Sequence, residues 1–258
     1  MSIKRKEDQH IGVRLNRWLL RFSRHWLRFA LTALGIYITL PFIAPTLMKV
    51  GLEGPARAIY FMYGAFCHQF AFRSIFLYGE QPFYPRYNTG SPYVPFEDYV
   101  QSLPEFAPDR QVYNFGPIGD IRGFNPAYQI AARDFLGNER MGYKLTICAR
   151  DIAIYVAMFM GGIAYGLVRK RLRPCPFWLY VLLGLMPIGL DGFSQLLGYP
   201  PFNFWEPRET LPFFRVVTGA LFGLMNVWLG FPYFEISMKE TQQELEEKFK
   251  RASVPVGD

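Results

Sequence analysis

The sequence has few of the residues on which most soluble metal and redox sites depend. It contains three cysteines and three histidines in 258 residues. Three cysteines are too few for a disulfide scaffold, and none of the spacings is that of a zinc finger. The sequence also lacks a Gly-rich phosphate loop after a strand, the His-Glu-x-x-His helix of metalloproteases and the c-type haem signature. These absences exclude the protein classes that depend on those motifs.

The chain also lacks an even coat of charge. Its net charge of +7 comes from 28 basic and 21 acidic residues, and the basic residues cluster beside apolar blocks, as membrane anchors do. We therefore expect no nucleic-acid partner. The mean hydropathy is barely above zero because polar segments separate the apolar blocks. Aromatic residues make up 18% of the chain, and Tyr and Trp favour the interfaces of a bilayer.

Four apolar blocks are long enough to cross a bilayer, which takes about 20 residues. They are Phe29–Val50, Leu145–Val168, Phe177–Leu197 and Leu211–Phe234. A fifth block, Ala56–Tyr78, is interrupted by polar residues. The pattern predicts an all-α protein, a polytopic bundle of transmembrane helices.

Arginines recur at steps of three and four residues near the N-terminus. They are Arg14, Arg17, Arg21, Arg24 and Arg28. This spacing places them on one stripe of a helix, with apolar residues on the opposite side. We favour an amphipathic helix that lies in the membrane interface, with its arginines against the anionic headgroups of the lipid bilayer. The alternative is a basic flank that only orients the first span.

The basic clusters also predict the topology. The N-terminal region and the loop at Arg169–Arg173 should both be cytoplasmic. An even number of crossings must then separate them, and the first two full blocks already supply two. The block Ala56–Tyr78 should therefore not cross, but form a re-entrant or outer-face helix. We expect a multi-pass protein of the cell membrane with both termini in the cytoplasm.

This topology divides the chain into five parts. They are a cytoplasmic interfacial helix (1–28), the first span with the outer-face helix (29–79), an extracytoplasmic cap (80–144), three spans (145–235) and a cytoplasmic polar helix and tail (236–258). Structureless loops as long as the cap are uncommon, and its many aromatics argue against disorder. We expect a long cap loop folded over the helix ends, with a short helix at Asn125–Leu136.

The residues that could carry chemistry converge near the outer surface in this topology. Ionisable groups at membrane depth are costly, so they normally face a bundle interior and mark a functional path. The candidate metal ligands are Cys67, His68, Cys148 and Asp151. The supporting residues are Gln69, Arg73, Arg150, Tyr155, Asp191, Gln195 and Arg215. No catalytic or cofactor-binding role can be assigned to any of them.

Four short signatures occur in order along the chain. They are Cys-His-Gln at Cys67–Gln69 with Arg-Ser-Ile-Phe and Tyr-Gly at Arg73–Gly79, Cys-Ala-Arg at Cys148–Arg150, the run Met186–Gln195, and Arg215 with the Val-Val-Thr-Gly that follows it. Together they resemble the domain-of-unknown-function family twenty eighty-five, a group of predicted small membrane proteins. The resemblance covers about Ala44 to Gly223 apart from the insert, and it implies no settled biochemical role. Asp151 replaces the second cysteine of many relatives, and the insert is longer than usual.

Three interpretations of the cysteine cluster remain open. Thiolate, imidazole and carboxylate together suit zinc or another transition metal. A disulfide between Cys67 and Cys148 is permitted outside the cytoplasm. In the third interpretation these are packing residues, with Asp151 or Asp191 paired to arginines.

Two functional hypotheses follow from these interpretations. The first is a membrane protein with a metal or thiol site at its outer face, acting in binding, transport or redox chemistry. The second is a structural accessory subunit of a larger complex with other membrane proteins. Whether the protein is an enzyme stays open.

Overall fold

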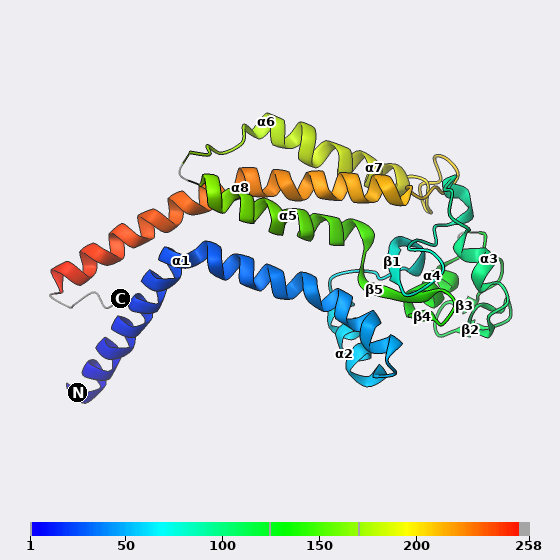
Figure 1. Ribbon diagram of the computed structural model, residues 1–258, viewed down its shortest axis with the longest axis horizontal. Helices are drawn as coiled ribbons and strands as arrows, with labels where there is room; N and C mark the ends of the chain where they lie inside the picture. Colours follow the sequence, from blue (N-terminus) through cyan, green and yellow to red (C-terminus); the bar gives the residue numbers. More distant parts are fainter. Residues whose placement is uncertain (1, 124, 170, 253–258) are drawn as a thin grey trace.

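A computed structural model describes residues 2–123, 125–169 and 171–252. It is 64% helical. Long helices form a bundle, and a small folded cap lies at one end of it (Figure 1). The first helix, α1, begins and the last helix, α8, ends at the opposite end of the bundle. The order of the elements therefore places the cap and the two terminal segments at opposite ends.

Among the described residues, four helices are long and apolar enough to cross a membrane. They are Gly12–Lys49 within α1 (Ser2–Lys49), α5 (Ala149–Val168), the continuous helix Phe177–Leu196, and α8 (Pro212–Arg251). The third consists of α6 (Phe177–Tyr180), the π-helical turn η4 (Val181–Leu185) and α7 (Met186–Leu196). The four predicted spans are thus confirmed as helices. The second begins at Ala149 instead of Leu145 because the preceding residues form a strand.

The interrupted block forms no membrane-length helix. Helix α2 (Glu53–Tyr63) has 11 residues, and at about 1.5 Å per residue it is too short to span a hydrocarbon core. The prediction of a helix through Cys67 and His68 is wrong, because both residues lie in the loop after α2. Gln69 has a left-handed φ of 56°, a conformation that no right-handed helix accommodates.

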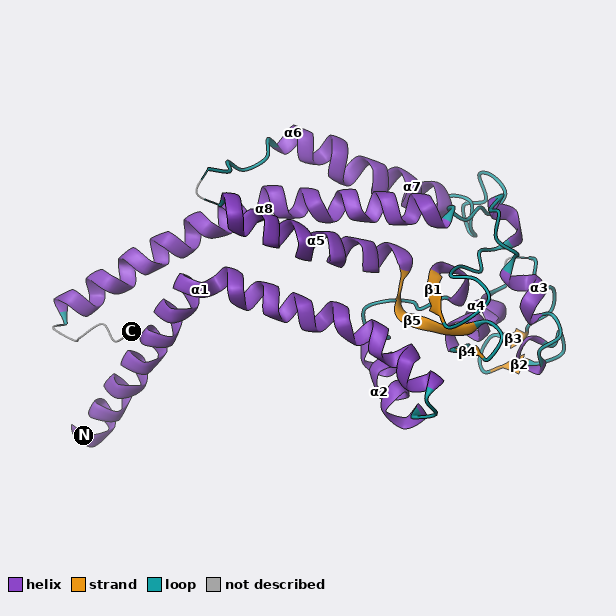
Figure 2. Ribbon diagram, viewed as in Figure 1, coloured by secondary structure: helices purple, strands orange, loops and turns teal. Residues whose placement is uncertain are grey.

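The cap contains strands, so the all-α prediction is only approximate (Figure 2). Strands β1 (Ser74–Leu77), β5 (Gly142–Cys148) and β4 (Gly137–Asn138) form an antiparallel sheet in the order β1-β5-β4. Strands β2 (Gln111–Val112) and β3 (Gly116–Pro117) form a second pair. The helices of the cap are α3 (Phe96–Val100), α4 (Pro126–Asp134) and the 3₁₀ turns η1 (Ala71–Arg73), η2 (Tyr87–Thr89) and η3 (Pro104–Phe106).

Aromatic side chains make the core of the cap. Phe96, Phe106 and Tyr128 are fully buried and pack edge to face. A buried ion pair joins Arg86 to Glu97 at 2.8 Å, with the guanidinium 4.9 Å from the centre of the Tyr128 ring. Residues 80–144 therefore form a folded unit with its own core instead of a long loop, and α4 lies within the helix predicted at Asn125–Leu136.

The predicted N-terminal helix is present and meets the first span at a kink. Helix α1 consists of two helical segments that join at His25, where φ is −121° and ψ is 17°. Before the bend, Leu20 packs against Leu245 and Phe249 of α8, and just after it the indole of Trp26 donates to Glu235 at 2.8 Å. The apolar side of the N-terminal segment is thus covered partly by α8, which includes the predicted polar C-terminal helix without a break.

Small residues allow close packing of α8 against α5. A Cβ atom at Gly223 would lie 2.3 Å from the carbonyl oxygen of Ile154, and one at Gly219 would lie 2.6 Å from that of Arg150. The opposing atoms belong to a helix backbone, so they cannot turn away. The two glycines therefore determine how close the two helices approach.

We predict that Gly223→Ala destabilises the protein by roughly 1–3 kcal/mol, as overpacking of a tight contact does. Gly230→Ala is the matched control on the same helix, because no atom lies within 4 Å of a Cβ at that position. Thermal unfolding of both variants in detergent checks the prediction. Equal melting temperatures for the two variants would contradict it.

Candidate functional site

The sheet of the cap brings the two cysteine signatures together. Cys148 is the last residue of β5 and the N-cap of α5, and it pairs with Ser74 of β1. Cys67 lies in the loop that leads to β1. The pairing of β1 with β5 therefore places the loop of Cys67 beside the first turn of α5.

Two sulfur atoms and a carboxylate meet at this junction. The Sγ atoms of Cys67 and Cys148 and a carboxylate oxygen of Asp151 all lie within 4.8 Å of one another. The Sγ of Cys148 is 3.1 Å from Oδ2 of Asp151. Both cysteines are free thiols, so the structure does not confirm a disulfide. All three residues are partly buried, which is typical of a ligand-binding group that stays accessible.

The backbone directs donors at the Cys67 sulfur. The backbone N–H groups of Gln69 and Cys148 point at Sγ, at 3.4 and 3.3 Å. The side-chain amide of Gln69 donates to the Tyr60 carbonyl at 2.8 Å. The backbone carbonyl of Gln69 accepts from the Lys144 ammonium at 2.7 Å. A non-glycine residue with left-handed φ is strained and persists where its surroundings hold it. These bonds hold Gln69 in place, so the backbone positions Cys67 before any ligand binds.

The two thiols differ in their affinity for a proton. The hydrogen bond to Cys148, and then burial, raise the pKa of Cys67. The same hydrogen bond lowers the pKa of Cys148, whose place at the N-terminus of α5 also favours a thiolate. Of the two thiols, Cys148 therefore releases its proton more readily, and it lies beside Asp151. Sulfur and carboxylate donors together suit a metal cation.

The fourth predicted ligand stands apart. The His68 ring is exposed and stacks on Phe70, with the ring centres 5.5 Å apart. His68 and Cys67 nevertheless line one shallow pocket of about 180 Å³, together with Arg133. The structure therefore brings three of the four predicted ligands together and places His68 at the rim of the pocket beside them.

Glu209 is the centre of a buried ion-pair group next to the cysteines. It pairs with Arg73 of η1 and with Arg215 of α8, and Tyr199 donates to it at 2.7 Å. Burial raises the pKa of Glu209, but the charges of Arg73 and Arg215 outweigh this effect, so the pKa lies below the usual 4.5. Glu209 therefore stays ionised and ties the cap to the last span.

Asp191 is the centre of a second group in the same region. It pairs with Arg150 of α5 and with Arg208. Gln195, one turn further along α7, donates to Asp191 at 3.1 Å and accepts from Arg215 at 3.1 Å. Gln195 thus joins the Asp191 and Glu209 groups into one network.

The remaining supporting residue lies below this network. Tyr155 follows Asp151 by one turn of α5, and its ring packs on Tyr37 of α1, with the ring centres 4.8 Å apart. The supporting residues predicted on the spans and on the Cys-His-Gln signature therefore gather at the cap end of the bundle. Among them, Gln69 contacts a candidate ligand directly, because its backbone N–H donates to Cys67.

Sequence reasoning missed two charged residues of this region. Glu209 lies in a Pro-rich connection just before the last span, and Lys144 lies just before an apolar run. Lys144 is fully buried, and burial lowers its pKa to about 7. In both cases the available signal was a single charge at the edge of an apolar block, which usually indicates a solvated flank.

Four membrane-length helices with a cysteine and ion-pair site at one end define a polytopic membrane protein. Residues 132–229 match the family described as "Predicted membrane protein (DUF2085)", so this segment is similar to that family. The segment contains Cys148, Asp151, Asp191, Glu209 and Arg215 but not Cys67. The resemblance inferred from the four signatures is thus confirmed.

A curated relative carries no assigned function either. The chain is 31% identical over 101 residues to "Uncharacterized protein MJ1492" of Methanocaldococcus jannaschii. The match covers 38% of this chain and 60% of the relative, so the chain spans less than two thirds of that relative's length. No solved structure matches.

We predict that Glu209→Gln destabilises the protein by roughly 3–5 kcal/mol, because two arginines lose a buried partner. The folded-state pKa of Glu209 lies below its unfolded value. Its stabilising contribution is therefore full above about pH 4.5 and is lost as the pH falls through the folded pKa. Thermal unfolding across acidic pH should show a steeper loss in the wild type than in the variant. Glu206→Gln, an exposed change in the same connection, is the control and should match the wild type.

Proposed function

We propose that the protein binds a thiophilic transition-metal ion, with zinc the first choice, through Cys67, Cys148 and Asp151 at the cap end of the bundle. The observation that carries this proposal is the meeting of three donor atoms within 4.8 Å. Two of the donors are sulfur, which selects soft or borderline metals over calcium and magnesium.

The donor separations suit a tetrahedral ion. With Zn–S bonds of about 2.3 Å and Zn–O bonds of about 2.1 Å, neighbouring donors lie roughly 3.5–3.8 Å apart. The observed Cys148–Asp151 distance is 3.1 Å, so modest side-chain shifts are enough. The N–H groups directed at Cys67 support a thiolate there once a metal displaces the proton.

Three protein ligands leave the fourth position of a tetrahedral ion open. This is the arrangement of zinc sites that exchange a ligand or bind a substrate, whereas structural sites are closed by four protein ligands. The pocket beside Cys67 and His68 gives access to this side. The arrangement therefore favours binding or transfer of an ion over a purely structural role.

The positive-inside rule assigns this site to the extracytoplasmic face. The arginines of α1 and the basic loop after α5 lie at the end of the bundle away from the cap (Figure 1). Basic flanks of this kind remain in the cytoplasm. Under this proposal the protein is a multi-pass protein of the cell membrane that handles a metal ion at its outer surface.

A second candidate function is that of an accessory subunit in a larger membrane complex. The turn between β2 and β3 favours it, because Tyr113 is 88% exposed and Phe115 is 50% exposed. Aromatic side chains are enriched in protein interfaces. In this alternative the cap docks on a partner and the cysteines serve only the fold. Removal of both rings by Tyr113→Ser/Phe115→Ser should then release a co-purifying partner.

We predict that purified wild-type protein holds about one zinc ion per chain, and that Cys67→Ser or Cys148→Ser weakens zinc binding at least roughly tenfold. Metal analysis and titration with zinc measure this effect. Cys175→Ser is the matched control, because that thiol lies in the loop before α6 and donates to the Pro176 carbonyl. Its zinc content should equal that of the wild type.

Two results would overturn the metal proposal. One is equal zinc affinity in all three cysteine variants and the wild type. The other is a wild-type protein in which thiol titration after unfolding finds Cys67 and Cys148 joined as a disulfide.

A further inference from the structure

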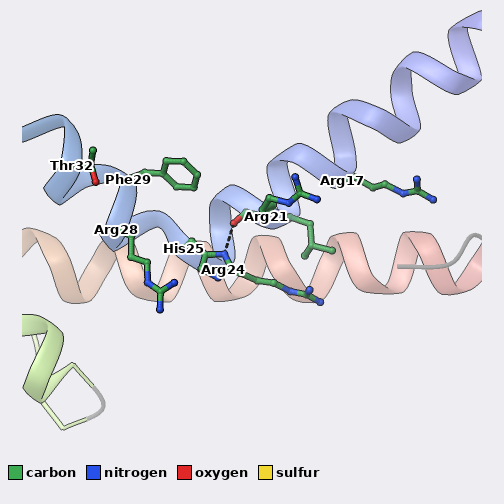
Figure 3. A pocket seen from close by; sticks show the side chains of 8 residues that line it. Arg17, Arg21, Arg24, His25, Arg28, Phe29 and Thr32 are labelled. Carbon is green, nitrogen blue, oxygen red and sulfur yellow. Dashed lines mark hydrogen bonds between the residues drawn. The ribbon is translucent and has the colours of Figure 1, made fainter. Parts of the chain in front are cut away.

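A basic pocket lies at the bend of α1, at the end of the bundle away from the metal site. Its volume is about 420 Å³. Four arginines line it, from both sides of the bend: Arg17, Arg21, Arg24 and Arg28 (Figure 3). The apolar side chains of Leu20 and Phe29 form part of its wall. The pocket therefore combines positive charge with an apolar surface.

The bend turns a stripe of arginines into a pocket. Steps of three and four residues already place these side chains on one helix face. At His25 the backbone leaves helical geometry, and the ring nitrogen Nδ1 lies 3.1 Å from the Arg21 carbonyl (Figure 3). A straight helix would present the same arginines as a ridge. Because of the bend, the arginines before and after His25 line the same pocket.

The charge of the pocket has one sign. Its eight lining residues, all among those described, include four arginines and no carboxylate. Arg24 also pairs with Glu246 of α8 at 3.0 Å, which anchors the N-terminal segment to α8. Such a lining suits an anion, and guanidinium groups suit phosphate in particular.

The pocket lies where the span begins. No charged residue occurs between Phe29 and Met48, so Arg28 is the last charge before the apolar part of α1. Phe29 borders the pocket at the point where this uncharged stretch begins. An occupant with an anionic head and an apolar tail complements both parts, whereas a soluble anion complements only the arginines.

We propose that this pocket binds the phosphate headgroup of an anionic phospholipid from the membrane leaflet at the end away from the cap. The phosphate lies among the guanidiniums, and the first part of an acyl chain lies against Phe29. By the positive-inside rule this leaflet is the cytoplasmic one, which is rich in anionic lipid. The proposal does not depend on the metal site.

The test compares two pairs of substitutions that remove equal charge from the same end of the bundle. Arg21→Gln/Arg28→Gln removes two pocket arginines, and Arg171→Gln/Arg173→Gln removes two exposed arginines outside the pocket. Delipidated protein in detergent is titrated with phosphatidylglycerol, and bound lipid is counted by native mass spectrometry. Each basic residue near an anionic lipid contributes about fivefold in affinity. We expect the pocket pair to weaken binding roughly thirtyfold and the loop pair to leave it within about twofold.

Four further measurements complete the test. Arg21→Lys/Arg28→Lys should retain most of the binding, and the Gln pair should melt like the wild type without lipid, which shows that it is folded. Phosphatidylcholine should bind much more weakly than phosphatidylglycerol. Equal losses in both Gln pairs would show diffuse attraction and overturn the proposal. Binding of glycerol phosphate as tight as that of the lipid would overturn it in favour of a soluble anion.

Discussion

The pairing of Glu209 with Arg73 and Arg215 is the interaction on which the arrangement of the site depends. An unpaired charge in this buried region is costly, so each of the three side chains requires the others. Arg73 lies between the Cys67 loop and β1, and Arg215 lies in the first turns of α8. One carboxylate therefore holds the cap, the loop before the last span and the bundle in a single orientation. The last span is thereby held beside the Cys67 loop, which the pairing of β1 with β5 brings to the first turn of α5.

The two ends of the bundle use arginine in different ways. At the cap end, Asp191 and Glu209 each bind two arginines, and the thiols and Asp151 add negative charge nearby. Charge there is largely compensated within the protein, so the two sulfur donors, and not a net charge, select the metal ion that we propose. At the other end, the arginines around His25 line a pocket without a carboxylate. We propose that the phosphate of a lipid headgroup binds in this pocket.

The errors in the sequence-based predictions have a common cause. The apolar side of the N-terminal helix, opposite its arginine stripe, was expected to lie against lipid. That side packs partly on Leu245 and Phe249 of α8. The helix through Cys67 was inferred from an apolar block, and the block ends at a strained Gln69. The cap was expected as a long loop, and it has an aromatic core. In each case the amphipathic or apolar pattern was recognised correctly. The residues that pack against it are distant in the sequence, so the pattern did not reveal them.

The sequence by itself determined the four spans, the failure of Ala56–Tyr78 to form a fifth, and the resemblance to the family, because hydropathy and short signatures are local properties of the chain. Only the tertiary structure decided which polar residues meet. Cys67 and Cys148 are 81 positions apart, and strand pairing brings them together. Glu209 forms ion pairs with arginines from two other elements. The bend at His25 arranges the arginine stripe around a pocket. Long-range contacts of this kind depend on how distant surfaces fit together, and no window of sequence contains that information.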